Sequence, residues 1–289
     1  MRSIKSKLSV HSALWVKQWG EDLTAHVARA RTLGYEGVEV SLLGIETSDV
    51  SLLSSVARDA GVTLKCTTGL SQECDISSQD ASTRRTGIDY LRRSADVVAE
   101  LGADLLTGVI YGPWGAFGEP ATRPERVRRA AESLAHVAPD FAVRGITLGI
   151  EAVNRFETDL INTADQALAL AHDIGAENVG VHLDTFHMNI EERDVYGAIA
   201  LVAEKLVHLH VSGSDRGRPV IGAFQWDSLF AALKDIGYEN WIGLEMFVQA
   251  NVPVSSDLRI WRPIEESPDD AAAYSRQFIL EGISRASEQ

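Results

Sequence analysis

The stretch Arg144-Gly-Ile-Thr-Leu-Gly-Ile-Glu151 contains the unit from which the whole chain is built. A glycine follows a helical segment, a short apolar run follows the glycine, and a carboxylate comes directly after the run. Glycine can take the left-handed conformation that ends a helix, and an apolar run that scarcely alternates is typical of a strand buried on both faces. The stretch therefore predicts a helix followed directly by an inner strand.

The same unit recurs along the chain. The other glycines and the apolar runs that follow them are Gly34 with Val38–Val40, Gly61 with Val62–Leu64, Gly102 with Leu105–Ile110, Gly175 with Val179–Leu183, and Gly237 with Trp241–Leu244. Apolar residues ahead of the glycines share one helical face, as Leu91, Ala95 and Val98 do. Adding the runs Leu8–His11 and Leu206–His210 gives eight predicted strands.

Helix–glycine–strand units repeated along a chain indicate parallel strands joined by helices. Eight such units can close into a (β/α)8 barrel, whereas the competing open sheet usually carries a glycine-rich phosphate loop after its first strand. Here the first strand is followed by His11-Ser-Ala-Leu-Trp15, which contains no glycine. We therefore expect one α/β domain, a (β/α)8 TIM barrel over residues 1–289, with a final helix over residues 267–289.

Composition and charge exclude several classes of protein. The formal net charge of −14 argues against a nucleic-acid-binding face and against docking on an anionic membrane. The chain has no apolar run long enough to span a bilayer, and its basic start lacks the apolar segment of a signal peptide. Cys66 and Cys74 are too few for a disulfide framework. We expect reduced thiols and a cytoplasmic protein with no nucleic-acid or membrane partner.

Four consecutive strands late in the chain end at residues of metal-ligand type. In order, these residues are Glu151, Asp184, His210 and Glu245. The carboxyl ends of barrel strands line the active site, so the four side chains should meet there. Three carboxylates at one rim would repel one another unless a cation held them. Three oxygen donors and one imidazole favour Mn²⁺, Co²⁺ or Mg²⁺ over structural zinc, so we expect one divalent metal ion.

Further polar and aromatic residues follow the same strands. The polar candidates for substrate contacts are Glu157, His187 and Arg216. On their residue type alone, a solvated loop charge or an ordinary polar contact is an equal alternative. Trp15 and Trp114 could form apolar walls for a sugar or simply pack at the barrel mouth. His182 and His208 lie one strand period behind the expected ligands, where core histidines are favoured over hydrogen-bond donors to the ligands.

At these residues the chain resembles the ketose 3-epimerases, which include the D-tagatose, D-psicose (allulose) and L-ribulose 3-epimerases, among the xylose isomerase-like TIM barrels. The stretches that carry the resemblance are Glu151-Ala-Val-Asn-Arg-Phe-Glu157, Leu183-Asp-Thr-Phe-His-Met-Asn-Ile-Glu-Glu192, Val207-His-Leu-His210 followed by Arg216, and Glu245 followed by Phe247. The first is similar to the family's E-x-V-N-R-[FY]-E, and the first two are highly specific. The resemblance covers essentially the whole chain.

The resemblance implies an isomerase that inverts carbon 3 of a free ketohexose or ketopentose through an enediolate. It implies one divalent metal ion, Mn²⁺ ahead of Co²⁺ or Mg²⁺, no organic cofactor, and a homodimer or homotetramer. The implied metal ligands are Glu151, Asp184, His210 and Glu245, the implied acid/base pair is Glu151 and Glu245, and the implied substrate-binding residues are Glu157, His187 and Arg216.

One loop departs from the family pattern, H-[IV]-G-E-x-x-R. Here His210 is followed by Val-Ser-Gly-Ser-Asp-Arg216, so the acidic residue is missing from its usual position. An aldose–ketose isomerase, and a related barrel enzyme acting on a 3-keto sugar or inositol derivative, therefore remain alternatives. The negative charge opposes a metal-dependent endonuclease on this barrel. The intact ligand set with both glutamates opposes a non-catalytic sugar-binding protein.

Overall fold

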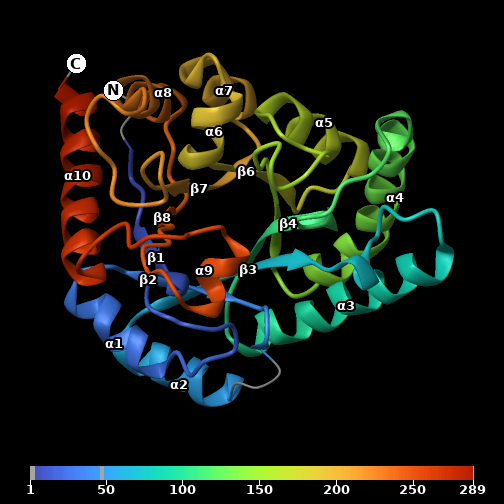
Figure 1. The fold of residues 1–289 in the computed structure, drawn as a ribbon, viewed down its shortest axis with the longest axis horizontal. Coiled ribbons are helices and arrows are strands. Elements are labelled where there is room, and N and C mark those ends of the chain that lie inside the picture. Colours follow the sequence, from blue (N-terminus) through green and yellow to red (C-terminus); the bar gives the residue numbers. More distant parts are fainter. Residues whose placement is uncertain (1–3, 46–48, 289) are drawn as a thin grey trace.

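The computed structural model of the chain describes residues 4–45 and 49–288. In this part of the chain eight parallel strands form a closed barrel in sequence order (Figure 1), which confirms the predicted TIM barrel. The strands are β1 (Leu8–His11), β2 (Gly37–Ser41), β3 (Thr63–Leu70), β4 (Leu105–Pro113), β5 (Thr147–Glu151), β6 (Val179–Asp184), β7 (Leu206–Val211) and β8 (Ile242–Leu244). The first three residues of the basic start and Gln289 of the expected final helix lie outside the described residues.

Helices surround the barrel (Figure 1). They are α1 (Thr24–Thr32), α2 (Val50–Ala60), α3 (Ala81–Glu100), α4 (Arg123–Ala142), α5 (Ala164–Ile174), α6 (Thr185–Glu191), α7 (Val195–Val202), α8 (Trp226–Ile236), α9 (Pro253–Asp257) and α10 (Pro268–Glu288), with 3-10 turns η1 (Ser12–Leu14), η3 (Gln72–Cys74) and η4 (Pro120–Thr122). All six helix-ending glycines of the sequence pattern have φ between 65° and 86°, as the left-handed ending requires.

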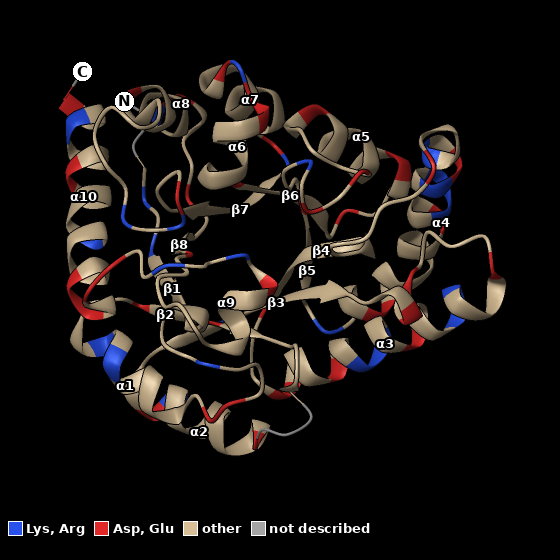
Figure 2. Cartoon of the chain, in the orientation of Figure 1, with Lys and Arg blue, Asp and Glu red and all other residues tan. Residues whose placement is uncertain are grey.

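The charged residues lie mainly on the outer helices and on loops, whereas the strands carry few of them (Figure 2). This distribution follows from the burial of the strands on both faces, because an unpaired charge is costly to bury. None of the described helices is both long and apolar enough to cross a membrane. Cys66 and Cys74 are both free cysteines, as expected.

Most predicted strands differ from the observed ones at their ends, and two of them are instructive. The strand predicted at Val62–Leu64 continues to Leu70. The added residues include polar ones, which a search for apolar runs could not assign to a strand. Its Lys65 is buried and forms an ion pair with Asp104, which lies just before β4. The last strand begins at Ile242 rather than at Trp241, because strand pairing to β1 and β7 starts there. Buried polar residues therefore extend β3 beyond its apolar run.

The register of the strands brings the expected ligands near one another, with offsets of two residues between some neighbouring strands. Asp184 pairs with His210 across β6 and β7, and His210 pairs with Gly243 across β7 and β8. Glu151 pairs with His182, two residues before Asp184. Because parallel strands of a barrel all end at the same rim, side chains from four separate segments meet without any long loop to carry them.

The packing of α10 on α8 yields a test of the closed barrel. A Cβ atom at Gly282 would lie 2.1 Å from Cε2 of Phe230, well inside van der Waals contact. We expect Gly282→Ala to lower the free energy of unfolding by about 1–3 kcal/mol, because overpacking outweighs the better helix propensity of alanine.

Urea unfolding followed by circular dichroism measures this change. Ser287→Ala is the control on the same helix, since its exposed hydroxyl donates to the carbonyl oxygen of Ile283 within the helix itself. That control should change the free energy by less than about 0.5 kcal/mol. Equal effects of the two substitutions would contradict the close helix packing.

Candidate active site

A cavity opens at the carboxyl ends of the strands. It encloses about 520 Å³ including its mouth, a size typical of small-molecule sites. Polar groups from Glu151, Glu245 and Arg216 line it together with the aromatic side chains of Trp114 and Phe247. A cavity with charged groups beside aromatic walls suits a small polar molecule that also presents carbon–hydrogen faces.

The structure brings together the four residues that end the late strands. One ligand atom from each of Glu151, Asp184, His210 and Glu245 can be chosen so that all four atoms lie within 4.8 Å of one another. All four residues are buried, and none is more than 9% exposed. The convergence follows from the register of β5 to β8, as expected from the strand ends.

His210 presents one ring nitrogen to the carboxylates. Its Nε2 donates to Oε2 of Glu39 at 2.6 Å, since an ionised carboxylate can only accept. Its Nδ1 is buried, has no hydrogen-bond partner among the described residues, and lies 3.5 Å from Oε1 of Glu245. Burial lowers the pKa of His210, but the charges of Glu39 and Glu245 outweigh it and raise that pKa well above its usual value.

The two glutamates of the site have opposite pKa shifts. Burial and the neighbouring charge of Glu245 raise the pKa of Glu151 well above its ordinary value. Burial also favours the neutral form of Glu245, but the charges of His210 and Arg216 prevail and hold its pKa well below the ordinary value. Without a cation, Glu151 therefore binds a proton more readily than Glu245 does.

Arg216 lies at the centre of the acidic residues. Its Nη1 donates to Oδ2 of Asp184 at 2.9 Å and to Oε2 of Glu245 at 2.8 Å. Its Nη2 lies 3.3 Å from Oε1 of Glu157 and 3.2 Å from Nε2 of His187. The residue is 4% exposed and has a positive φ of 68°, which is uncommon for a side chain of this size. The backbone strain is consistent with a requirement for the guanidinium at this point.

The donor set fits a divalent cation. Four carboxyl groups of the site, those of Glu151, Glu157, Asp184 and Glu245, share one guanidinium, so their negative charge exceeds the positive charge that Arg216 supplies. Buried carboxylates without a counter-charge are costly. Oxygen donors with one unpartnered imidazole nitrogen match the ligand preference of Mn²⁺, Mg²⁺ or Co²⁺.

The three expected substrate-binding residues and Trp114 meet beside this site. Oε2 of Glu157 accepts a hydrogen bond from the indole of Trp114 at 2.9 Å, and Oε1 accepts one from Nδ2 of Asn154 at 2.9 Å. The backbone N–H of Asn154 donates to Nδ1 of His187 at 3.0 Å. Glu157, His187, Arg216 and Trp114 all line the cavity. Asn154 thus holds two of them, a role that its place in the Glu151–Glu157 stretch did not reveal.

Trp15 lies outside the cavity lining. Its indole donates to Oδ1 of Asp269 at 3.0 Å, and its ring stacks on His26 with 5.5 Å between centroids. Trp19, four residues later, lines the cavity instead and donates to Oδ2 of Asp257 at 3.0 Å. Of the two open interpretations of Trp15, packing at the barrel mouth agrees with the structure. The sequence could not show which of the two tryptophans lines the cavity, because both lie in the irregular segment that follows β1.

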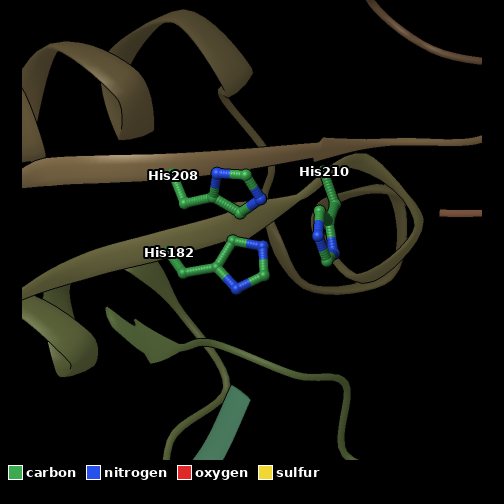
Figure 3. A group of neighbouring side chains, drawn as sticks. All are labelled: His182, His208 and His210. Atoms are coloured by element: carbon green, nitrogen blue, oxygen red, sulfur yellow. The ribbon is translucent and has the colours of Figure 1, made fainter. Parts of the chain in front are cut away.

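His182 and His208 are fully buried behind the site, as expected. Figure 3 shows their rings side by side, with the ring of His210 beyond them. The His210 ring meets that of His182 edge-on, with 4.2 Å between centroids, and that of His208 with 4.8 Å. Nitrogens of the three histidines also lie within 4.8 Å of one another. However, this group shares His210 with the acidic site, and neither His182 nor His208 lines the cavity.

Glu39 is a buried residue that sequence analysis missed. It lies in β2 within Gly37-Val-Glu-Val-Ser41. One acidic residue between two valines of a strand does not by itself indicate a functional site. Burial would raise the pKa of Glu39, but the charges of His208 and His210 hold it well below its ordinary value. Its carboxylate is thus ionised in the interior of the barrel. His208 and His210 follow Glu39 by 169 and 171 positions in the sequence, and only the closure of the barrel makes them its neighbours.

The loop that departs from the family pattern has a structural explanation. Position 213, where the family has glutamate, is glycine, and its N–H donates to the carbonyl oxygen of Gly217 at 2.7 Å. A Cβ atom at Gly213 would lie 2.5 Å from the carbonyl oxygen of Arg218, so this turn has no room for a side chain. Residues 212–215 do not line the cavity, whereas Arg216 does.

Comparisons with known proteins agree with this geometry. A model of the xylose isomerase-like TIM barrel family matches residues 27–278. The ketose 3-epimerase of Arthrobacter globiformis is 34% identical over 281 residues, which cover 96% of this chain and 97% of the relative. The D-psicose 3-epimerase of Agrobacterium fabrum is 33% identical over 290 residues, which cover 96% of this chain and all of the relative, 100%.

Solved structures lead to the same group. A structure of L-ribulose 3-epimerase matches with a TM-score of 0.91 and 32% identity, covering 98% of this chain and 96% of that one. A structure of D-psicose 3-epimerase from Clostridium cellulolyticum H10 with D-tagatose matches with a TM-score of 0.90 and 29% identity, covering 96% and 99%. The chain therefore belongs to the xylose isomerase-like TIM barrel family and, within it, to the ketose 3-epimerases, a group of isomerases.

Proposed function

We propose that this protein is a divalent-metal-dependent epimerase that inverts carbon 3 of a free ketohexose or ketopentose. The observation that carries the proposal is the convergence of Glu151, Asp184, His210 and Glu245 at a cavity that Glu151, Glu245 and Arg216 line. The similarity to ketose, L-ribulose and D-psicose 3-epimerases over nearly the whole chain supports the class of substrate. The expected homodimer or homotetramer and the cytoplasmic location stay predictions.

Glu151, Asp184, His210 and Glu245 would hold the cation, and we favour Mn²⁺ over Co²⁺ or Mg²⁺. When bound, the cation supplies Lewis acidity that stabilises negative charge on the ketose oxygens. The four residues come from neighbouring strands of a rigid barrel, so the chain orients the donor atoms before the ligand arrives.

Glu151 and Glu245 act as the acid/base pair. In one direction the ionised Glu245 takes the proton from carbon 3, the electrons of the carbon–hydrogen bond form a carbon 2–carbon 3 double bond, and the electrons of the carbonyl π bond move onto the oxygen of carbon 2 to give an enediolate. The protonated Glu151 then returns a proton to the opposite face of carbon 3, and the two glutamates exchange roles in the reverse direction. The opposite pKa shifts of the pair support this division. No electrons leave the substrate, so the step requires no redox cofactor.

Glu157, His187 and Arg216 hold the hydroxyl and carbonyl groups around the reacting carbon. Asn154 and the indole of Trp114 fix Glu157, so the carboxylate faces the cavity in one orientation. Among the described residues that line the cavity, Arg216 is the one with a permanent positive charge, and it is already paired with carboxylates. This pairing supports a free sugar over a phosphorylated one.

The glycine at position 213 affects how the alternative enzyme functions compare with a ketose 3-epimerase. Because residues 212–215 do not line the cavity, the missing acid supports no change of substrate class. A 3-keto sugar or inositol derivative is therefore a weaker candidate than a ketose. An aldose–ketose isomerase would use the same residues and differs only in where the substrate lies.

Proton exchange in D₂O tests the reaction. We expect Mn²⁺-loaded protein to place deuterium on carbon 3 of D-tagatose, D-fructose or L-ribulose while the epimer accumulates, as followed by NMR. Deuterium on carbon 1 or 2 with aldose formation would show an aldose–ketose isomerase instead. Absence of exchange with every free ketose would contradict the proposed substrate class.

Removing either acid/base carboxylate should stop turnover. We expect Glu151→Gln and Glu245→Gln each to lower kcat by about 10²–10⁴-fold, since positioned proton transfer contributes an effect of this size. Glu191→Gln is the control, because its carboxylate pairs with Arg155 away from the cavity. A near-normal kcat in either cavity variant would remove that residue from the acid/base pair.

Arg216→Ala should mainly weaken substrate binding. The change removes the group that faces Glu157 and His187 in the cavity, so we expect kcat/KM to fall by about 10–100-fold, mostly through KM. Steady-state kinetics at saturating Mn²⁺ measure both constants. An unchanged KM would assign Arg216 to the stability of the loop alone.

A further inference from the structure

A carboxylate in β2 supports the acidic site from behind. Oε2 of Glu39 accepts a hydrogen bond from Nε2 of His210 at 2.6 Å, and Oε1 accepts one from Nε2 of His208 at 3.1 Å. The hydroxyl of Ser9 donates to the same Oε1. Glu39 is fully buried and does not line the cavity, so these three donors surround it without access to a substrate.

Gly243 in β8 makes room for this arrangement. A Cβ atom there would lie 2.1 Å from Oε1 of Glu39 and 2.8 Å from Cδ2 of His210. The same glycine pairs with His210 in the register of β7 and β8. Glu39 and His210 both lie close to Gly243. Because this residue has no side chain, the contact between β2 and β7 can form in the crowded barrel interior.

The hydrogen bond from Nε2 decides which nitrogen of His210 faces the acidic site. A ring that binds a cation gives up one proton, and because Glu39 holds the proton at Nε2, the lone pair is then on Nδ1. That Nδ1 is the buried atom without a hydrogen-bond partner among the described residues, 3.5 Å from Oε1 of Glu245. The edge-on rings of His182 and His208 limit rotation of the His210 ring from its other side (Figure 3).

We propose that Glu39 is a positioning residue for cation binding: it fixes the tautomer and the ring orientation of His210 so that Nδ1 is available beside the three carboxylates. The inference rests on the proposed function in that these four residues hold a divalent cation. Glu39 acts through His210 and touches neither substrate nor the reacting carbon. Hydrogen-bond partners of this kind orient a ligating imidazole and raise its affinity for the metal.

Titration of metal-free protein with Mn²⁺ tests the proposal without any sugar. We expect Glu39→Gln to weaken Mn²⁺ binding by about 10–100-fold, because the amide cannot accept from both histidines as the carboxylate does. Calorimetry gives the affinity, and the visible spectrum of Co²⁺-loaded protein reports the ligand geometry. Glu39→Asp keeps the charge but withdraws it by one methylene, so its affinity should lie between those of the parent and Glu39→Gln.

Thr107→Val is the matched control. Thr107 is fully buried in β4 and its Oγ1 lies 2.7 Å from Nδ1 of His182, so the change removes a hydrogen bond next to His182 without touching His210. This variant should lose stability yet bind Mn²⁺ as tightly as the parent and leave the Co²⁺ spectrum unchanged. Equal weakening in Thr107→Val would show a general packing effect and overturn the positioning role.

The outcomes separate the inference from the proposed function. Parent-like Mn²⁺ affinity and Co²⁺ spectra in folded Glu39→Gln and Glu39→Asp would overturn the positioning role while the epimerase proposal stands. A parent protein that binds Mn²⁺ but exchanges no ketose proton would overturn the function while the positioning role stands. A parent protein that binds neither Mn²⁺ nor Co²⁺ would overturn both.

Discussion

The mutual repulsion of buried carboxylates is the constraint on which the site depends. Glu151, Glu157, Asp184 and Glu245 share the single guanidinium of Arg216, which adopts a left-handed backbone conformation to reach three of them. Such a cluster is unfavourable unless protonation or a cation relieves it. Burial and the charge of Glu245 raise the pKa of Glu151, so protonation of Glu151 can reduce the repulsion when no cation is bound. The same imbalance makes the site receptive to a divalent ion.

The barrel supplies the rigidity that this electrostatic cluster needs. Strand pairing fixes the level of each side chain, and the register of β5 to β8 leaves little freedom to move the carboxylates apart. Behind them lies a layer of buried polar side chains, formed by Glu39 and the three histidines, in which Glu39 accepts hydrogen bonds from His208 and His210. Gly243 allows that layer to close. The charge cluster at the rim and the polar layer beneath it are therefore one structure, joined through His210.

Segments outside the barrel strands supply part of the cavity wall. Trp19 lies beyond β1 and bonds to Asp257 at the end of α9, so two loops from opposite ends of the chain meet over the cavity. Leu258, directly after α9, also lines it. The turn at Gly213, by contrast, has no room for a side chain and does not line the cavity.

The sequence by itself determined the barrel and the rim residues. Helix-ending glycines and apolar runs are local signals, and the ends of parallel strands share one rim in any barrel, so Glu151, Asp184, His210 and Glu245 could be placed together in advance. Only the tertiary structure decided that Trp19 rather than Trp15 lines the cavity and that Glu39 supports His210. Those contacts join segments far apart in the chain, and their residues carry no periodic signal, because closure of the barrel alone makes them neighbours.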